Sequence, residues 1–204
     1  MTAIRRSLTR EQVAALVCST LERHGVEVVL TGGAVVSIYS DNEYESDDLD
    51  FVQTGLARKV APAMEELGFE RRGRHWVHPN SAYWVEFPPG PVQVGNEVVK
   101  RFSERSSPVG LLRLLGPTEC VMDRLAGFYH WNDPQCLDQA VAVARRHPID
   151  LARVEEWSKR RGKARPLSRL PQPAGQASLG WLRPTQRWPF AGRAAARCPK
   201  RPTK

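Results

Sequence analysis

VVLTGG, residues Val28–Gly33, and SDDLDFV, residues Ser46–Val52, are the two stretches that decide the fold. The first is an apolar run that ends in two glycines, and the second holds Asp48 and Asp50 within another apolar run. Because residues two apart in a strand point to the same face, these two carboxylates project together. Adjacent carboxylates repel each other unless a cation lies between them, and Mg²⁺ is the cation that such oxygen ligands share with substrate phosphates.

The two glycines allow the backbone to turn sharply and to approach a ligand closely. A helix that starts at Gly33 would present its free N–H groups as an anion site beside the carboxylates. A glycine pair after a strand is usually only a turn, and two aspartates in a strand are usually only a solvated end. Together, however, a phosphate site and a metal site predict phosphoryl or nucleotidyl transfer.

The pattern Gly32-Gly33, fourteen intervening residues, then Asp48-Leu49-Asp50 resembles the motif of the nucleotidyltransferase superfamily, with its polymerase-β-like fold. Within that superfamily it is similar to the small stand-alone proteins related to toxin–antitoxin and phage-abortive systems. The superfamily has a third carboxylate between apolar residues on a later strand, and Glu86 in Tyr83–Phe87 matches it. The resemblance is close over 26–90 and loose over 111–160, and its gap between glycines and aspartates is long.

The resemblance implies that Asp48, Asp50 and Glu86 are catalytic and hold two Mg²⁺ ions, with a nucleoside triphosphate (such as ATP) as substrate. It also implies an α+β fold, in which a nucleotidyltransferase core with a small mixed sheet precedes a short helical bundle. Contacts to the nucleotide are expected from Thr31, Gly32, Gly33, Ser37 and Ser46.

A later helix contains Asp123 and Arg124, where related nucleotidyltransferases have a Lys-Asp-Arg run at the rim of the site. The lysine position is Met122 here, so a substrate or phosphate contact and a plain salt bridge are equal alternatives. The sequence does not rank the candidates for a γ-phosphate clamp, which are Arg71, Arg72, Arg74 and Arg124.

The chain divides into a core over 1–107, a helical region over 108–161 and a basic, proline-rich tail over 162–204. A capping box at Thr9 and Gln12 predicts a first helix over 8–24. Further expected elements are strands at 26–31 and 48–52, helices at 33–40 and 56–67, a loop at 41–45, a hairpin over 69–87 and an edge strand at 92–94. From Pro108 the pattern reads as helical, with helices starting at Thr118, Asp133 and Asp150.

The formal net charge of +8 comes from the tail, because 162–204 holds ten of the 30 Lys and Arg residues and none of the 22 Asp and Glu residues. The tail lacks hydrophobic periodicity, so we expect it to be disordered. It is either a basic arm that touches nucleic acid or an extension without function. Buried thiols at Cys18 and Cys120, without a C-x-x-C pair, suit a reducing cytoplasm. No apolar run approaches the roughly 20 residues of a membrane span, so no membrane partner is expected.

The acceptor of the nucleotide stays open at this point. The first hypothesis is transfer to a hydroxyl of a macromolecule, either transfer RNA or a cognate protein. A second is a catalytically weak or inactive partner in a toxin–antitoxin-type system, which binds nucleotide or protein. A third is modification of a small hydroxylated antibiotic.

Overall fold

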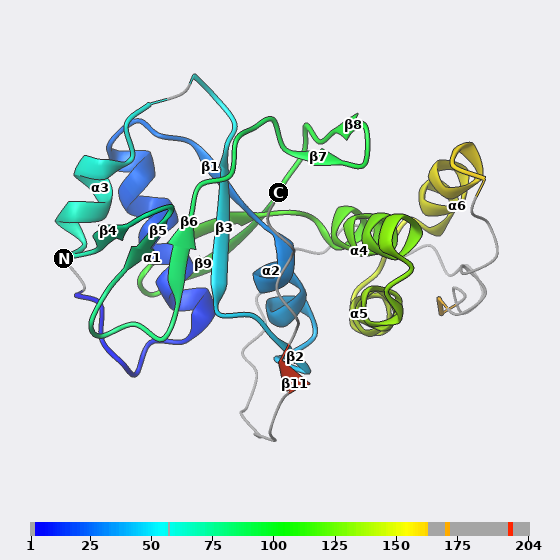
Figure 1. The fold of residues 1–204 in the computed structure, drawn as a ribbon, viewed down its shortest axis with the longest axis horizontal. Coiled ribbons are helices and arrows are strands. Elements are labelled where there is room, and N and C mark those ends of the chain that lie inside the picture. The colour runs from blue at the N-terminus through cyan, green and yellow to red at the C-terminus, as the bar shows by residue number, and fades with distance from the viewer. Residues whose placement is uncertain (1–2, 57, 163–169, 172–195, 198–204) are drawn as a thin grey trace.

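The computed structural model describes residues 3–56, 58–162, 170–171 and 196–197, and it shows a mixed α+β fold (Figure 1). The predicted fold class, with a mixed sheet followed by helices, is confirmed. The strands are β1 (Val28–Thr31), β2 (Tyr44–Glu45), β3 (Asp48–Gln53), β4 (Glu70–Arg72), β5 (His75–Val77), β6 (Trp84–Glu86), β7 (Gln93–Val94), β8 (Glu97–Val98), β9 (Ser103–Ser107), β10 (Gly110–Leu114) and β11 (Ala196–Arg197). The helices are α1 (Arg10–Arg23), α2 (Gly32–Tyr39), α3 (Ala61–Glu66), α4 (Pro117–Trp131), α5 (Pro134–Arg146) and α6 (Leu151–Arg160).

Seven strands form one sheet in the order β4-β5-β6-β3-β1-β10-β9. β1 lies antiparallel to β3 and parallel to β10, and β6 lies parallel to β3. The two edges are completed by antiparallel pairs, β4 with β5 and β10 with β9. The aspartate strand β3 is therefore the middle strand of the sheet, and β1, which leads into the glycine pair, is its direct neighbour.

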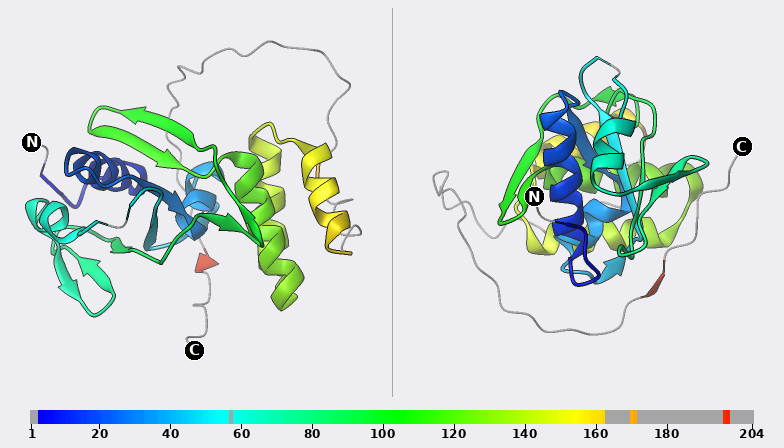
Figure 2. Two further views of the ribbon diagram at one scale, coloured as in Figure 1. Left: turned by 90° about the horizontal axis from the view of Figure 1, so that it is seen from above. Right: turned by 90° about the vertical axis from the view of Figure 1, so that its left-hand side faces the viewer.

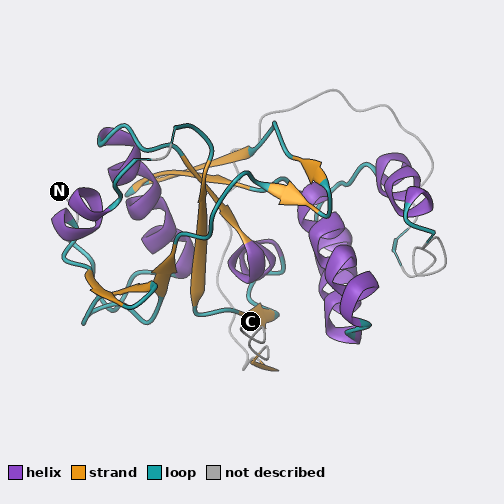
Figure 3. Cartoon of the chain, turned by 45° about the horizontal axis from the view of Figure 1, so that its top comes forward, coloured by secondary structure: helices purple, strands orange, loops and turns teal. Residues whose placement is uncertain are grey.

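Apart from α2, the helices form two groups at opposite ends of the molecule (Figures 1 and 2). α1 and α3 lie together at one end, and α4, α5 and α6 lie at the other (Figures 1 and 2). α2 lies between the strands and the pair formed by α4 and α5 (Figure 3). The start of α2, which carries the glycine pair, therefore lies where the sheet meets the helical region.

The first helix begins as its sequence predicts. Thr9 caps α1, its hydroxyl accepts a hydrogen bond from the Gln12 backbone, and the Gln12 side chain accepts one from the Thr9 backbone. Gly25 follows the helix with a φ of +71°, a conformation that favours glycine. The capping box thus fixes the start of α1, and the glycine turns the chain toward β1.

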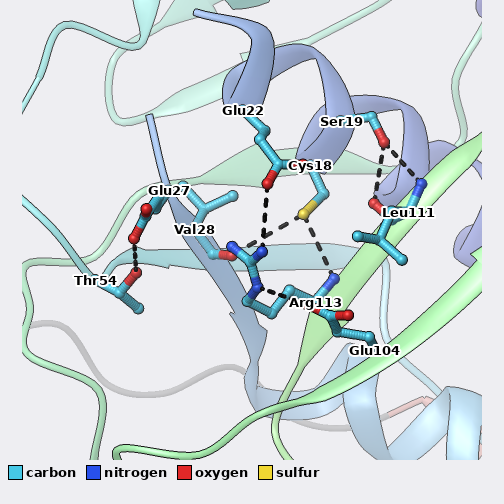
Figure 4. A network of polar contacts seen from close by, with 9 residues as sticks. All are labelled: Cys18, Ser19, Glu22, Glu27, Val28, Thr54, Glu104, Leu111 and Arg113. Atoms are coloured by element: carbon cyan, nitrogen blue, oxygen red, sulfur yellow. Dashed lines mark hydrogen bonds and ion pairs between the residues drawn. The ribbon is translucent and has the colours of Figure 1, made fainter. Parts of the chain in front are cut away.

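Polar contacts join α1 to β10 (Figure 4). The Ser19 hydroxyl accepts from the Leu111 N–H at 2.7 Å and donates to the Leu111 carbonyl at 3.1 Å. Arg113 forms ion pairs of 3.3 Å with Glu22 of α1 and with Glu104 of β9. The second half of the core sheet is therefore tied to the first helix of the chain.

The expectation of helix from Pro108 is wrong for the first residues of that region. Leu112 and Leu114 are fully buried in β10, which pairs with β1 and β9. β10 has only five residues, of which Leu112 and Leu114 are buried while Leu111 and Arg113 are half-buried. An apolar run this short cannot be told from a piece of helix by its period. The core sheet therefore extends to Leu114, and the first helix after it is α4.

Other elements differ in their limits from the prediction. α3 starts at Ala61 rather than at 56, with Pro62 in its first turn, where proline fits because no intrahelical donor is needed. The 92–94 strand pairs with β8 in a separate two-stranded sheet, and part of the expected loop at 41–45 forms β2, which pairs with β11.

The three helices after the sheet were predicted, with one error in their caps. Asp133 and Asp150 cap α5 and α6, as expected. Thr118 was expected to cap α4, but Gly116 is the cap residue, and the Thr118 hydroxyl instead accepts from the Asp150 N–H at 3.0 Å. This bond links the start of α4 to the start of α6.

The core is continuous from the sheet into the helical region and includes Leu170, which is 2% exposed. Cys18 and Cys120 are buried thiols, and burial raises the pKa of Cys120 to about 12. In the part of the chain that the structure describes, no helix has the length and apolar character to cross a membrane. Most of the tail expected to be disordered, over 162–204, lies outside the described residues.

Candidate functional site

The register of the sheet brings four polar side chains to one level across four neighbouring strands. Thr31 of β1 pairs with Asp50 of β3, Asp50 pairs with Glu86 of β6, and Glu86 pairs with His75 of β5. Paired residues on adjacent strands share a face and lie about 5 Å apart. The sheet therefore brings together Asp50 and Glu86, which lie far apart in the sequence.

Alternation along β3 separates the aspartates from the core. Asp48 and Asp50 are half-buried, whereas Leu49 and Phe51 are fully buried on the other face. Trp84 and Glu86 of β6 are likewise half-buried around a fully buried Val85. The three predicted carboxylates thus share one face of the sheet.

Gly32 lies directly against Asp50. Its φ is +72°, and a Cβ at this position would lie 2.6 Å from Asp50 Oδ2. A side chain here would therefore have both a strained backbone and a steric clash. The first glycine of the motif holds the start of α2 in contact with the carboxylate.

Gly33 and Ser46 make the second close approach of the site. A Cβ on Gly33 would lie 2.8 Å from the Ser46 hydroxyl, which also donates to the Asp48 carbonyl at 3.5 Å. Thr31 donates its hydroxyl to the Asp50 carbonyl at 3.2 Å and makes no side-chain cap on α2. With no side-chain cap there, the first N–H groups of α2 are available to an anion beside the aspartates.

Ser37 does not share this surface. It is fully buried, and its hydroxyl donates to the Gly33 carbonyl one turn earlier in α2. The structure thus groups Thr31, Gly32, Gly33 and Ser46 with the aspartates and places Ser37 inside the fold.

Glu86 is already engaged by two residues of the neighbouring hairpin. Its Oε1 contacts His75 Nε2, and its Oε2 lies 3.3 Å from Arg74 Nε. Repulsion from Asp50 on one side and attraction to these two groups on the other favour this arrangement. The contact to His75 was not foreseen, because it depends on the register of β5 and β6 rather than on spacing along the chain.

The donor set fits the expected magnesium ion in part. Asp48 and Asp50 lie two residues apart on one face of β3, and Gly32 lies directly against Asp50. Carboxylate oxygens arranged in this way are suitable ligands for a hard cation. Glu86 would have to leave His75 and Arg74 to join them. Among the described residues, no group of three or more His, Cys, Asp or Glu is arranged to hold a metal ion.

Arg10 is a residue of this region that sequence reasoning missed. It is 5% exposed, its Nε donates to the Ser46 carbonyl at 2.8 Å, and its Nη1 donates to the Asn42 side chain. Its guanidinium also lies over the Tyr83 ring, 5.1 Å from the centroid. An arginine in a first helical turn opposes the helix dipole, and that mismatch was the available signal for a special role.

Asp123 and Arg124 form an ion pair with each other, the second of the two alternatives that the sequence left open. Arg124 Nη1 also lies 3.4 Å from Gln139 Oε1 of α5. Burial alone would lower the pKa of Arg124, but the adjacent Asp123 carboxylate raises it above its ordinary value. This arginine is therefore a half-buried, charged link between α4 and α5.

No protein-family model matches the chain, and no curated protein matches it. Among solved structures it is similar to the antibiotic-resistance factor ANT(2'')-Ia, known from a solution structure. The identity is 13% and the TM-score is 0.43, over 75% of this chain and 92% of that chain. A likeness at this level does not show a function for this chain.

Proposed function

We propose that this protein is a nucleotidyltransferase that moves a nucleoside monophosphate from a nucleoside triphosphate to an acceptor hydroxyl. The observation that supports the proposal most strongly is the contact between the glycine turn and the carboxylate face, Gly32 against Asp50. It combines an anion site at a helix start with a pair of oxygen ligands, which is what a metal–triphosphate complex requires.

Each group has a role in this reaction. Asp48 and Asp50 would hold Mg²⁺, which supplies charge neutralisation at the reacting phosphate and activation of the attacking hydroxyl. The start of α2 binds phosphate oxygens through its N–H groups, and the hydroxyls of Thr31 and Ser46 lie beside it. A second ion, as the resemblance implies, would require Glu86 to release the hairpin.

The test is nucleotide transfer from the four α-³²P-labelled triphosphates with Mg²⁺. Acceptors are total transfer RNA, cell lysate and a set of small hydroxylated antibiotics, so that each hypothesis about the acceptor has its own readout. We expect labelled product that the Asp48→Asn and Asp50→Asn variants reduce by at least about 100-fold, as removal of charge stabilisation does. The matched control is Asp47→Asn, which removes a carboxylate directly before β3 that is not one of the three predicted carboxylates, and it should keep its activity.

The alternative is a non-catalytic partner that keeps the fold, and the engagement of Glu86 by His75 and Arg74 favours it. That alternative predicts nucleotide binding without label on any acceptor. The proposal fails if the wild-type protein transfers nothing, or if Asp48→Asn and Asp47→Asn are equally active.

A further inference from the structure

The hairpin of β4 and β5 carries three exposed arginines around its turn at Gly73. Arg71 donates through Nε to the Gly73 carbonyl at 3.1 Å, and Arg72 lies 3.7 Å from Glu70. Arg74 differs, because it contacts Glu86 and His75, two of the residues that the sheet register aligns with Asp50. It is therefore the arginine of the hairpin that the fold ties to the site.

The guanidinium of Arg74 is held at one end and open at the other. Its Nε lies 3.3 Å from Glu86 Oε2 and 3.3 Å from His75 Nε2, and its side chain is 64% exposed. Glu86 is only 17% exposed, so the anchor is fixed while the arginine faces solvent. Both of these contacts to described residues are made by Nε and not by the two terminal nitrogens. The planar fork of a guanidinium matches the oxygens of a phosphate.

We propose that Arg74 binds the phosphate chain of the nucleoside triphosphate and that Glu86 positions it there. The inference rests on the proposed function and assigns a cation to the phosphate chain. Arg124, the other candidate with a fixed position, already neutralises Asp123 and links α4 to α5. Arg74 instead lies beside the same face of the sheet as Asp50, because its partner Glu86 pairs with Asp50 in the register.

In this proposal Glu86 has a role at the site that does not depend on binding a metal ion, because it holds Arg74. A phosphate chain that enters beside Asp48 and Asp50 meets like charges, and a cation held at the next strand offsets them. Glu86 contributes by fixing that cation in place, which lowers the entropy cost of binding with a long side chain.

The experiment measures binding by calorimetry on the full chain, with ATP and inorganic tripolyphosphate as probes, in Mg²⁺ and in EDTA. Arg74→Ala should weaken both ligands by about tenfold or more, the usual effect of a charge-assisted hydrogen bond. Arg72→Ala is the matched control on the other side of the same turn, and it should change binding by less than about twofold. Adenosine, which has no phosphate, and an RNA oligonucleotide without a 5′-triphosphate should bind the Arg74 variant as they bind the wild type.

A double-mutant cycle tests the positioning role of Glu86. In EDTA, Glu86→Gln should weaken tripolyphosphate binding several-fold when Arg74 is present and should have no further effect in the Arg74→Ala background. Additive losses would assign Glu86 an independent role and overturn this part of the proposal. A Glu86 that only supports the fold would lower the unfolding temperature without this coupling.

The outcomes separate the two proposals. If the wild type transfers nucleotide but Arg74→Ala binds triphosphate as well as Arg72→Ala does, the assignment of Arg74 is wrong and the proposed function stands. If triphosphate binding depends on Arg74 but no acceptor is labelled, the phosphate site stands and the transferase is wrong. An effect confined to the RNA oligonucleotide, or no binding of any triphosphate, overturns the assignment of Arg74.

Discussion

Among single residues, Gly32 is required to be glycine for two reasons, its backbone conformation and its contact with Asp50. Its backbone is left-handed, and the space where a Cβ would stand belongs to the Asp50 carboxylate. Gly33 meets the second constraint alone, through Ser46. The motif therefore needs two glycines for two different neighbours.

Replacing Gly32 by alanine tests this reasoning. The left-handed backbone costs about 1–2 kcal/mol and the contact with Asp50 adds about 1–3 kcal/mol, so we expect a total loss of about 2–5 kcal/mol in the free energy of unfolding. The control is Gly162→Ala at the end of α6, where φ is +66° and nothing lies within 4 Å of the added Cβ among the described residues. Equal losses in urea denaturation of the two variants would show that the contact with Asp50 does not matter.

The site residues differ in how far sequence alone could find them. Asp48, Asp50 and the glycine pair lie within short stretches, so local spacing is enough to place them on a strand and at the helix after it. The engagement of Glu86 by His75 could not be found in this way, because it depends on the pairing of two strands joined by a turn of uncertain length. Arg10 was missed because its partners, in the loop before β3, are distant in the sequence.

At the scale of elements, the loop between α2 and β3 is held from two sides. Arg10 of α1 binds the Ser46 carbonyl and Asn42, while Arg146 of α5 lies 2.9 Å from Glu43. His147, just after α5, contacts the Tyr39 carbonyl at 3.0 Å at the end of α2. The loop that places Ser46 beside Gly33 is thus held by α1, which precedes it in the sequence, and by α5, which follows it.

Removal of the Arg10 side chain should loosen this loop. Arg10→Ala leaves the Ser46 carbonyl without its donor, and we expect a loss of about 1–3 kcal/mol in stability together with faster amide exchange at 41–46. Arg6→Ala removes an exposed arginine from the same end of the chain and should stay within about 0.5 kcal/mol of the wild type. Should Arg10→Ala exchange at 41–46 as slowly as Arg6→Ala, the loop does not depend on this arginine.

Elements with a strong local signal were predicted, and elements set by their neighbours were not. α1, α5 and α6 carry capping side chains, and β3 alternates between polar and buried residues. β10 is too short for such a signal, and its buried residues Leu112 and Leu114 depend on contacts of the strand with α1, β1 and β9. Whether this segment forms a strand or a helix depends on packing against residues that are distant in the sequence.

At the scale of the whole molecule, the core does not end with α6. Leu170 is 2% exposed and belongs to the same core as the sheet and the helices. The division of the chain at 162 remains a prediction about composition, but at least one residue beyond it has a place in the fold. A deletion that tests whether the tail has a function should therefore keep this leucine.

Truncation of the chain at two points tests that view. A chain that ends after Pro171 keeps Leu170, whereas one that ends after Gly162 loses its burial, worth about 1.5–3 kcal/mol. Leu170→Ala in the full chain should cost about 2–4 kcal/mol by the same reasoning plus the cavity left behind. If both truncated chains unfold at the same denaturant concentration, Leu170 makes no contribution to stability.

The position of β10 also sets an order of events during synthesis of the protein. β1, β3 and β6, which bear the site, leave the ribosome before β10, yet β1 has one open edge until residues up to Leu114 arrive. The contacts of α1 through Ser19 and Glu22 also form only after β10 is synthesised, because their partners lie in that strand. Pairing between such distant segments is slow to form, so the carboxylate face should be completed late, when β10 closes the sheet.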